Sequence, residues 1–281
     1  HANMITRLPE RWQYRLLLWP LPILLLLCYV ILFAGIVTWS VTLPELGVDN
    51  YARLANDSSI HAVLWRTLHL CAIVGVCALL LAFLMAYCWL YSSSRWQRWV
   101  ELCIFLPFFI SVLVRTFGWL VALRNNGLVN SWLQDLGLID SPLALTRNTL
   151  GVIIAMVHFM VPFAFFPLLS SMRQIDDRVL LAARGLGASR LRVFISVFLP
   201  QTLPGLLGAF IMVFVFCLGF FIIPAILGGG STLMAAEYVF LQMFQTYNWG
   251  IGAAFCVLML VLVSGLVWLL MRFSRVERLV G

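Results

Sequence analysis

The chain has 281 residues, of which 63% are hydrophobic and only 10% are charged, with a formal net charge of +7 at pH 7. A soluble domain of this length needs more polar surface than this composition supplies, which excludes an ordinary soluble enzyme or binding domain. We therefore expect the bilayer to be the solvent, and a helix needs roughly 20 apolar residues to cross its hydrocarbon core.

Six apolar segments are long enough to cross a membrane, and each is predicted to be helical because lipid satisfies no backbone hydrogen-bonding group. In chain order these segments are 16–39, 67–91, 102–123, 149–172, one within 193–227, and 249–271. The sequence thus predicts an all-α integral membrane protein with about six transmembrane helices. The longer connections 40–66 and 124–148 are expected to hold short helices.

The distribution of arginine predicts the orientation, since all 18 cationic residues are Arg. Thirteen arginines lie before the first segment, between the second and third, between the fourth and fifth, and after the sixth, whereas four lie in the other connections. Cytoplasmic loops carry the excess of positive charge, so both termini are predicted to be cytoplasmic. The arginines form no continuous basic stripe, and no nucleic-acid partner is predicted.

We divide the chain into a cytoplasmic N-terminal segment 1–15, a transmembrane domain 16–272 with its core at about 64–272, and a cytoplasmic tail 273–281. Residues 1–3 precede Met4 and are interpreted as a non-native remnant. The seven cysteines form no CxxC pair, so neither a zinc site nor a redox motif is predicted. We also find no spacing typical of a catalytic constellation.

The predicted inner connection 173–200 has a helical pattern of its own. Asp176 or Asp177 is predicted to cap a first helix, and Gly185 with Gly187 to end it. Ser189 is predicted to cap a second helix. Its apolar face is expected to carry Leu191, Phe194 and Phe198, and Pro200 and Pro204 to open the fifth span. From these residues alone, an ordinary amphipathic connector remains an alternative.

The same segment resembles the EAA loop of type I ABC importer permeases. That pattern is Glu-Ala-Ala, three residues, Gly, nine residues, Ile, one residue, Leu-Pro. Ala182-Ala183, Gly187 and Leu199-Pro200 match at this spacing, Val197 stands for Ile, and Leu181 stands in place of the usual Glu. The resemblance implies that the residues coupling to an ATPase are Ala182, Ala183, Gly187, Ser189, Arg190, Leu199 and Pro200.

Further matches lie at 106–109, 114–119, 126–130, 162–176 and 219–221, with Gly228-Gly229 after them. Most of the chain after about residue 60 resembles the first permease of the spermidine/putrescine (polyamine) importers. The resemblance implies a MetI-like fold in the bacterial inner membrane. It also implies three protein partners: a second homologous permease, a dimeric ABC ATPase and a periplasmic solute-binding protein.

The chain contains no GxxxxGK[ST] motif and no Lys, so we expect it to be non-catalytic and to hold no cofactor. ATP and Mg²⁺ are expected at the partner ATPase. For the solute path, ionisable residues inside a membrane and aromatic faces are candidates, since a cationic solute pairs with carboxylates and π-systems. We select Arg115, Trp119, Phe220, Phe221, Glu237 and Tyr238.

Two alternatives remain. The solute of an ABC permease could instead be an amino-acid derivative, an opine-like compound or a metal complex. An ion-driven secondary transporter is a different class, which usually shows more intramembrane acids and an inverted repeat. A membrane scaffold without solute flux would not need a loop of the EAA type.

Overall fold

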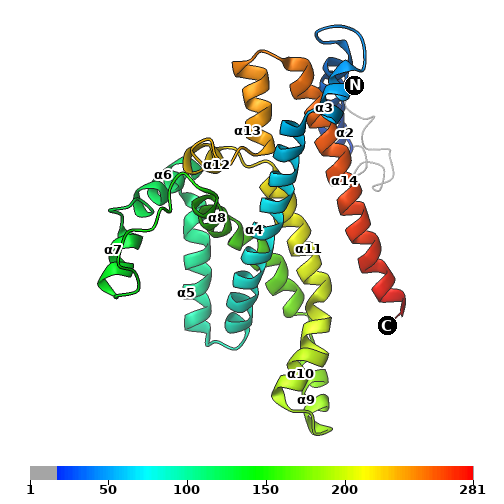
Figure 1. Ribbon diagram of the computed structural model, residues 1–281. Coiled ribbons are helices and arrows are strands. Elements are labelled where there is room, and N and C mark those ends of the chain that lie inside the picture. The colour runs from blue at the N-terminus through cyan, green and yellow to red at the C-terminus, as the bar shows by residue number, and fades with distance from the viewer. Residues whose placement is uncertain (1–17, 281) are drawn as a thin grey trace, which may run out of the picture. The chain divides into compact units, whose positions relative to one another are not determined.

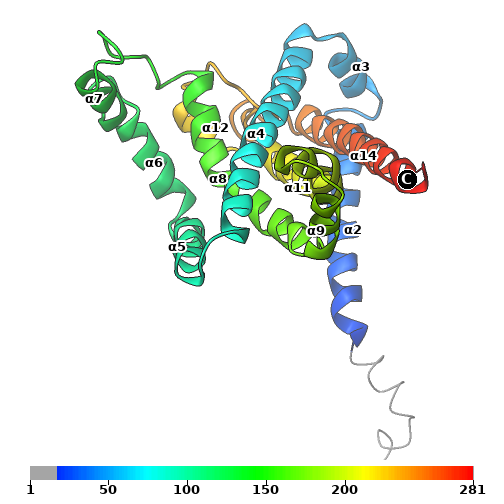
Figure 2. The same ribbon diagram turned by 90° about the horizontal axis from the view of Figure 1, so that it is seen from below.

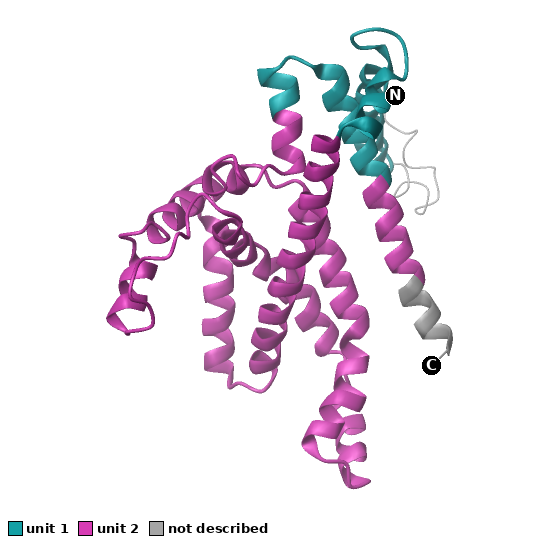
Figure 3. Ribbon diagram, in the orientation of Figure 1, with its two compact units in different colours: residues 1–57, 241–261 teal, residues 58–240, 262–281 magenta. Residues whose placement is uncertain are grey.

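The computed structural model describes residues 18–280 (Figures 1 and 2), and every regular element in this range is a helix. The predicted all-α class is confirmed. The segment 1–15, with the interpreted remnant 1–3, lies outside the described residues. The chain divides into two compact units, coloured in Figure 3, which comprise residues 1–57 with 241–261 and residues 58–240 with 262–281.

Five helical segments among the described residues are long and apolar enough to cross a membrane, and a bent helix pair makes a sixth if it is one span. The five are α2 (Pro20–Thr42), α4 (Ser58–Leu90), α8 (Thr149–Met172), the continuous run Arg190–Leu218, and α14 (Trp249–Val280), whose apolar part ends at Arg272. Each overlaps a predicted segment. The cytoplasmic placement of the termini stays a prediction.

The first unit joins α2, α3 (Asp49–Asn56), η4 (Leu241–Gln245) and the first part of α14. The side-chain amide of Asn50 donates hydrogen bonds to the carbonyls of Ser40 at 2.9 Å and Leu43 at 2.7 Å. The rings of Trp39 and Trp249 pack edge to face, with centroids 5.6 Å apart. These contacts fix the turn after α2 and confirm the short helix expected in 40–66.

The core of the second unit is formed by α4, α8 and α11 (Leu199–Leu218), which lie side by side in both views. Ala78, Ala82 and Ala86 recur every four residues on α4 and are fully buried. Small residues at this spacing allow membrane helices to approach closely. Gly205 on α11 likewise leaves no room for a Cβ beside the Ser171 side chain of α8. Small residues therefore allow the backbones of the core helices α4, α8 and α11 to pack close to one another.

The prediction of one continuous span over 102–123 is wrong. The chain instead forms α5 (Ser94–Phe105), the 3₁₀ turn η2 (Leu106–Phe109) and α6 (Val112–Ala122), and the two arms are bent by 104°. Pro107 lacks the amide hydrogen that a continuing helix needs, and Ile110 has an extended backbone. α7 (Leu128–Asp135) follows, as the short helix expected in 124–148.

The fifth span begins earlier than its prolines predict. α10 (Arg190–Val193) runs through a π-helical turn, η3 (Phe194–Phe198), directly into α11. Pro200 cannot donate the i→i−4 hydrogen bond, and a π turn is one of the ways in which a helix accommodates such an interruption. After α11 come α12 (Ile222–Leu227) and α13 (Ala235–Phe240).

Candidate functional site

The connection after α8 folds into the capped helix that its sequence predicts. In α9 (Asp177–Gly185), the Asp176 carboxylate accepts a hydrogen bond from the backbone N–H of Arg178 at 2.9 Å. Gly187 closes the helix with a φ of +88°, a conformation that favours glycine. At α10, the Ser189 hydroxyl accepts from the N–H of Arg192 at 3.3 Å. Both predicted N-caps are confirmed.

The helix α9 has no buried residue, although it carries several apolar side chains. Val179 and Leu186 lie seven residues apart, on one face, and Leu186 is 89% exposed. Ala182 lies between them on the same face and is also exposed. Leu181, in the position where the EAA pattern has Glu, is 62% exposed. Val179, Ala182 and Leu186 thus form an apolar face that lies open in the described part of the chain.

Aromatic contacts hold the base of this loop against the end of α4. The rings of Phe194 and Phe198 pack edge to face on Tyr87, with centroids 5.4 and 5.5 Å apart. Both rings also contact Phe83. The prediction that Leu191 shares their face is wrong, because Leu191 is exposed while the two phenylalanines point inward. Residues 173–200 form the segment for which the resemblance implies coupling, and we call it the coupling loop. It combines an anchored base with an exposed α9.

Three of the six candidate path residues meet two adjacent residues of α8, His158 and Phe159. The guanidinium of Arg115 lies over the ring of Phe159, and its Nε is buried without a hydrogen-bond partner in the described structure. Phe220 packs edge to face on the same ring, with centroids 5.0 Å apart. The indole Nε1 of Trp119 donates to Nδ1 of His158 at 3.2 Å. The bent α6 and the break after α11 therefore converge on 158–159.

The other three candidates form a second group. The ring of Phe221 packs at a tilt against that of Phe240 on α13, with centroids 4.9 Å apart. Glu237 precedes Phe240 by less than one helical turn, and its Oε2 is buried without a hydrogen-bond partner in the described structure. Burial raises the pKa of the Glu237 carboxyl. Tyr238 is buried. Phe220 belongs to the first group and Phe221 to the second, so these two adjacent residues connect the groups along the chain.

The sequence reasoning missed the central position of Phe159 and the aromatic row that continues from it. Phe163, one turn later, stacks on Phe159 and contacts Phe108 and Phe216, with centroids 5.2 and 5.0 Å apart. The spacing of four between Phe159 and Phe163 predicts a shared face. The contact between Phe163 and Phe108 depends on the bend between α5 and α6, and the periodicity of apolar residues in the sequence does not reveal this bend.

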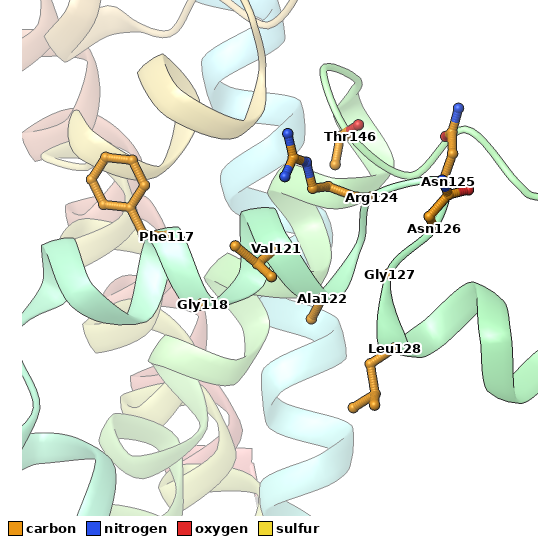
Figure 4. Close-up of a pocket in the computed structure, with 10 residues that line it drawn as sticks. All are labelled: Phe117, Gly118, Val121, Ala122, Arg124, Asn125, Asn126, Gly127, Leu128 and Thr146. Carbon is orange, nitrogen blue, oxygen red and sulfur yellow. The ribbon is translucent and has the colours of Figure 1, made fainter.

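A cavity of about 1080 Å³ lies where α6 turns into α7 (Figure 4). Phe117, Gly118 and Val121 line it from α6, and Asn125, Asn126 and Gly127 line it from the turn. Arg124 and Thr146 supply further polar side chains. Among the described residues, no group of His, Cys, Asp and Glu suited to a metal ion is found. None of the residues that line this cavity is among the predicted path residues.

Known proteins agree with this architecture. Residues 78–275 match the family described as "Binding-protein-dependent transport system inner membrane component". The spermidine/putrescine transport system permease protein PotB of Escherichia coli (strain K12) is 31% identical over 234 residues, covering 83% of this chain and 84% of PotB. PotB of Haemophilus influenzae is 28% identical over 228 residues, covering 81% and 79%.

Two solved structures share the fold. A permease chain of the bacterial alginate ABC transporter, in complex with alginate pentasaccharide-bound periplasmic protein, matches with a TM-score of 0.78 at 19% identity and covers 94% of each chain. Another structure of an alginate importer matches with a TM-score of 0.73 at 19% identity. Because the family match covers well over half of the chain, this multi-pass inner-membrane protein belongs to the binding-protein-dependent transport system permeases of ABC importers.

Proposed function

We propose that this permease forms half of a solute path together with a second homologous permease, and that a dimeric ABC ATPase drives it through the coupling loop. ATP and Mg²⁺ are bound by the ATPase, which this chain needs because it contains no phosphate-binding loop. A periplasmic binding protein delivers the solute to the outer side, and the closure of the ATPases switches the spans between inward- and outward-facing states.

The observation that carries this proposal is the exposure of α9. The helix α9 is capped at both ends and is joined to a base that Phe194 and Phe198 anchor, yet it has no buried residue and meets the core only through the half-buried Leu180. Its small and aliphatic face, with Val179, Ala182 and Leu186, suits close packing in a groove. An ordinary amphipathic connector would instead bury this face against the bundle.

For the solute, we propose a small organic amine, with spermidine and putrescine as the first to test. The relatives named for these polyamines support the class. The aromatic row around Phe159 offers cation–π contacts, and Glu237 offers a carboxylate without a cation partner. Arg115 has the same charge sign as a polyamine, so its proposed role is to hold Phe159 in the wall of the path.

The test is solute-stimulated ATPase activity of the full complex with its binding protein in proteoliposomes. We expect spermidine or putrescine to stimulate hydrolysis, and an amino-acid derivative or a metal complex to have no effect. Stimulation by one of those solutes instead would replace the polyamine assignment and leave the coupling proposal intact. Uptake by the permease alone without ATP would contradict the coupling proposal and favour an ion-driven mechanism.

A further inference from the structure

Two adjoining cavities separate α9 from the end of α4. The first, of about 400 Å³, is lined by Tyr87, Arg184 and Arg190 among others. The second, of about 440 Å³, is lined by Trp89, Gln97 and Arg173 among others. Tyr91, Asp177, Leu180 and Phe198 line both. The two cavities therefore form one two-lobed space around Tyr91 and the inward side of α9.

This space lies at the level where two spans end. α4 ends at Leu90 and α8 ends at Met172, and residues next to both ends line the cavities. Tyr87 and Trp89 on α4, and Tyr91 directly after it, are of the aromatic types that concentrate where hydrocarbon gives way to lipid headgroups. The arginine distribution predicts that this boundary belongs to the inner leaflet. A molecule that binds in this two-lobed space must therefore have an apolar part and a polar part.

The charges of the space are unbalanced. Arg173, Arg184 and Arg190 line it, and Asp177 is the acid that faces them from the cavity lining. Within the described residues, the guanidinium groups of Arg184 and Arg190 make no hydrogen bond or ion pair. Arg173 lies over the ring of Trp89 at 5.5 Å. Three exposed guanidinium groups thus line a headgroup-level cavity with net positive charge, where they are accessible to an anionic ligand.

We infer that this space binds the headgroup of an anionic phospholipid. The phosphate lies among the arginines and accepts hydrogen bonds from them, and the acyl chains follow the apolar end of α4. Basic pockets between membrane helices on the cytoplasmic side bind anionic headgroups in this way. The inner-leaflet placement rests on the orientation assumed in the proposed function.

The site lies on the side of α9 that carries Leu180 and Leu181, away from the face formed by Val179, Ala182 and Leu186. Asp177, Leu180 and Arg184 line the cavities, whereas Val179 and Leu186, on the other face, line neither. A lipid in this space therefore supports α9 from within while leaving the outer face open to the ATPase. It follows that coupling depends on the anionic lipid content of the inner leaflet.

The test uses the complete transporter in nanodiscs of phosphatidylcholine mixed with phosphatidylglycerol, with lipids retained after purification identified by native mass spectrometry. We expect the wild type to retain phosphatidylglycerol. The double variant Arg173→Gln/Arg184→Gln should bind it about 25-fold more weakly, since each arginine near an anionic surface contributes roughly a factor of five. Tyr91→Phe is a milder second variant, which should weaken retention by only about threefold if its hydroxyl donates one neutral hydrogen bond.

The matched control is Arg178→Gln/Arg192→Gln, which removes the same charge from the same segment but from residues that line neither cavity. We expect this control to retain the lipid within about twofold of the wild type, as surface charges away from a site contribute little. Equal loss in both double variants, or wild-type retention in Arg173→Gln/Arg184→Gln with unchanged thermal unfolding, would overturn the inference.

Two further arms separate the lipid from other anions. Displacement of phosphatidylglycerol by millimolar inorganic phosphate would identify a site for a soluble anion and overturn the lipid assignment. Equal retention of phosphatidylcholine would show that charge is not recognised. If the wild type retains phosphatidylglycerol but no ATPase co-purifies, the proposed coupling fails while the lipid site stands, so the two failures are distinguishable.

Discussion

The guanidinium carbon of Arg115 lies 4.0 Å from the centre of the Phe159 ring. This pair joins α6, which lies beyond the 104° bend, to the core helix α8. The neighbouring hydrogen bond from Trp119 to His158 makes a second link between the same two helices. The bent arm therefore has two side-chain links to one short stretch of α8, in addition to its packing against α12.

We expect Arg115→Met and Phe159→Leu to destabilise the permease non-additively. Each variant removes one half of a partly desolvated cation–π pair, which is worth about 0.5–2 kcal/mol. A double-mutant cycle measured by thermal unfolding in one detergent should therefore give a coupling energy in that range. Additive effects of the two substitutions would show that the contact contributes nothing measurable.

The positive φ of Gly187 should make it sensitive to any side chain. Ala at this position forces an L residue into the left-handed region, at a cost of about 1–2 kcal/mol, and should lower solute-stimulated ATPase activity by distorting the end of α9. Gly185→Ala is the matched control, because Gly185 also has open space for a Cβ but no positive φ. Equal loss of activity in both variants would argue that the left-handed backbone conformation of Gly187 is not the cause.

Glu237→Gln should have opposite effects on the stability of the permease and on its transport activity. Because burial raises the pKa of the Glu237 carboxyl, its stabilising protonated form is fully populated below the ordinary glutamate pKa and is lost as pH rises through the raised pKa. The neutral amide should therefore raise stability at pH 8 by about 1 kcal/mol, a low value because the carboxyl is partly exposed, and change little at pH 4. Uptake of a dicationic solute should fall.

The measurement is thermal unfolding at both pH values alongside uptake in proteoliposomes. Glu237→Asp keeps the charge and serves as the control, and it should retain part of the uptake. Unchanged uptake by Glu237→Gln would remove this residue from the solute path, whatever its stability.

Close packing between α8 and α11 predicts different outcomes for two glycines on one helix. Gly205→Ala places a methyl group against the Ser171 side chain and should destabilise the protein by about 1–3 kcal/mol. Gly208→Ala meets nothing within 4 Å and should be neutral or stabilise α11 by up to about 1 kcal/mol. Thermal unfolding of both variants checks this, and similar losses in the two would contradict the packing argument.

The sequence could predict those features that depend on local chemistry. Uninterrupted apolar length identified α8 with its observed bounds, and the hydrogen-bonding side chains of Asp176 and Ser189 marked two helix starts. These predictions succeed because each depends on residues within a few positions of one another.

The break at 106–111 could not be predicted from apolar length, because hydropathy does not distinguish a straight span from a bent one. Pro107 is a local signal for it, yet Pro162 and Pro167 lie inside α8 without a comparable break. Whether a proline breaks a helix depends on how its neighbours satisfy the freed carbonyl. For the same reason, the meeting of Arg115 and Phe220 on Phe159 became apparent only with the fold.

The exposure of α9 also affects the steady-state amount of this protein in the cell. A loop that presents Leu186 and Val179 to water is a ready target for proteases and chaperones until a partner covers it. We therefore expect the permease made without its ATPase to be degraded faster than the permease made with it. On the proposed coupling to an ATPase, the exposed face of α9 would therefore keep the amount of permease in the cell close to the amount of its ATPase.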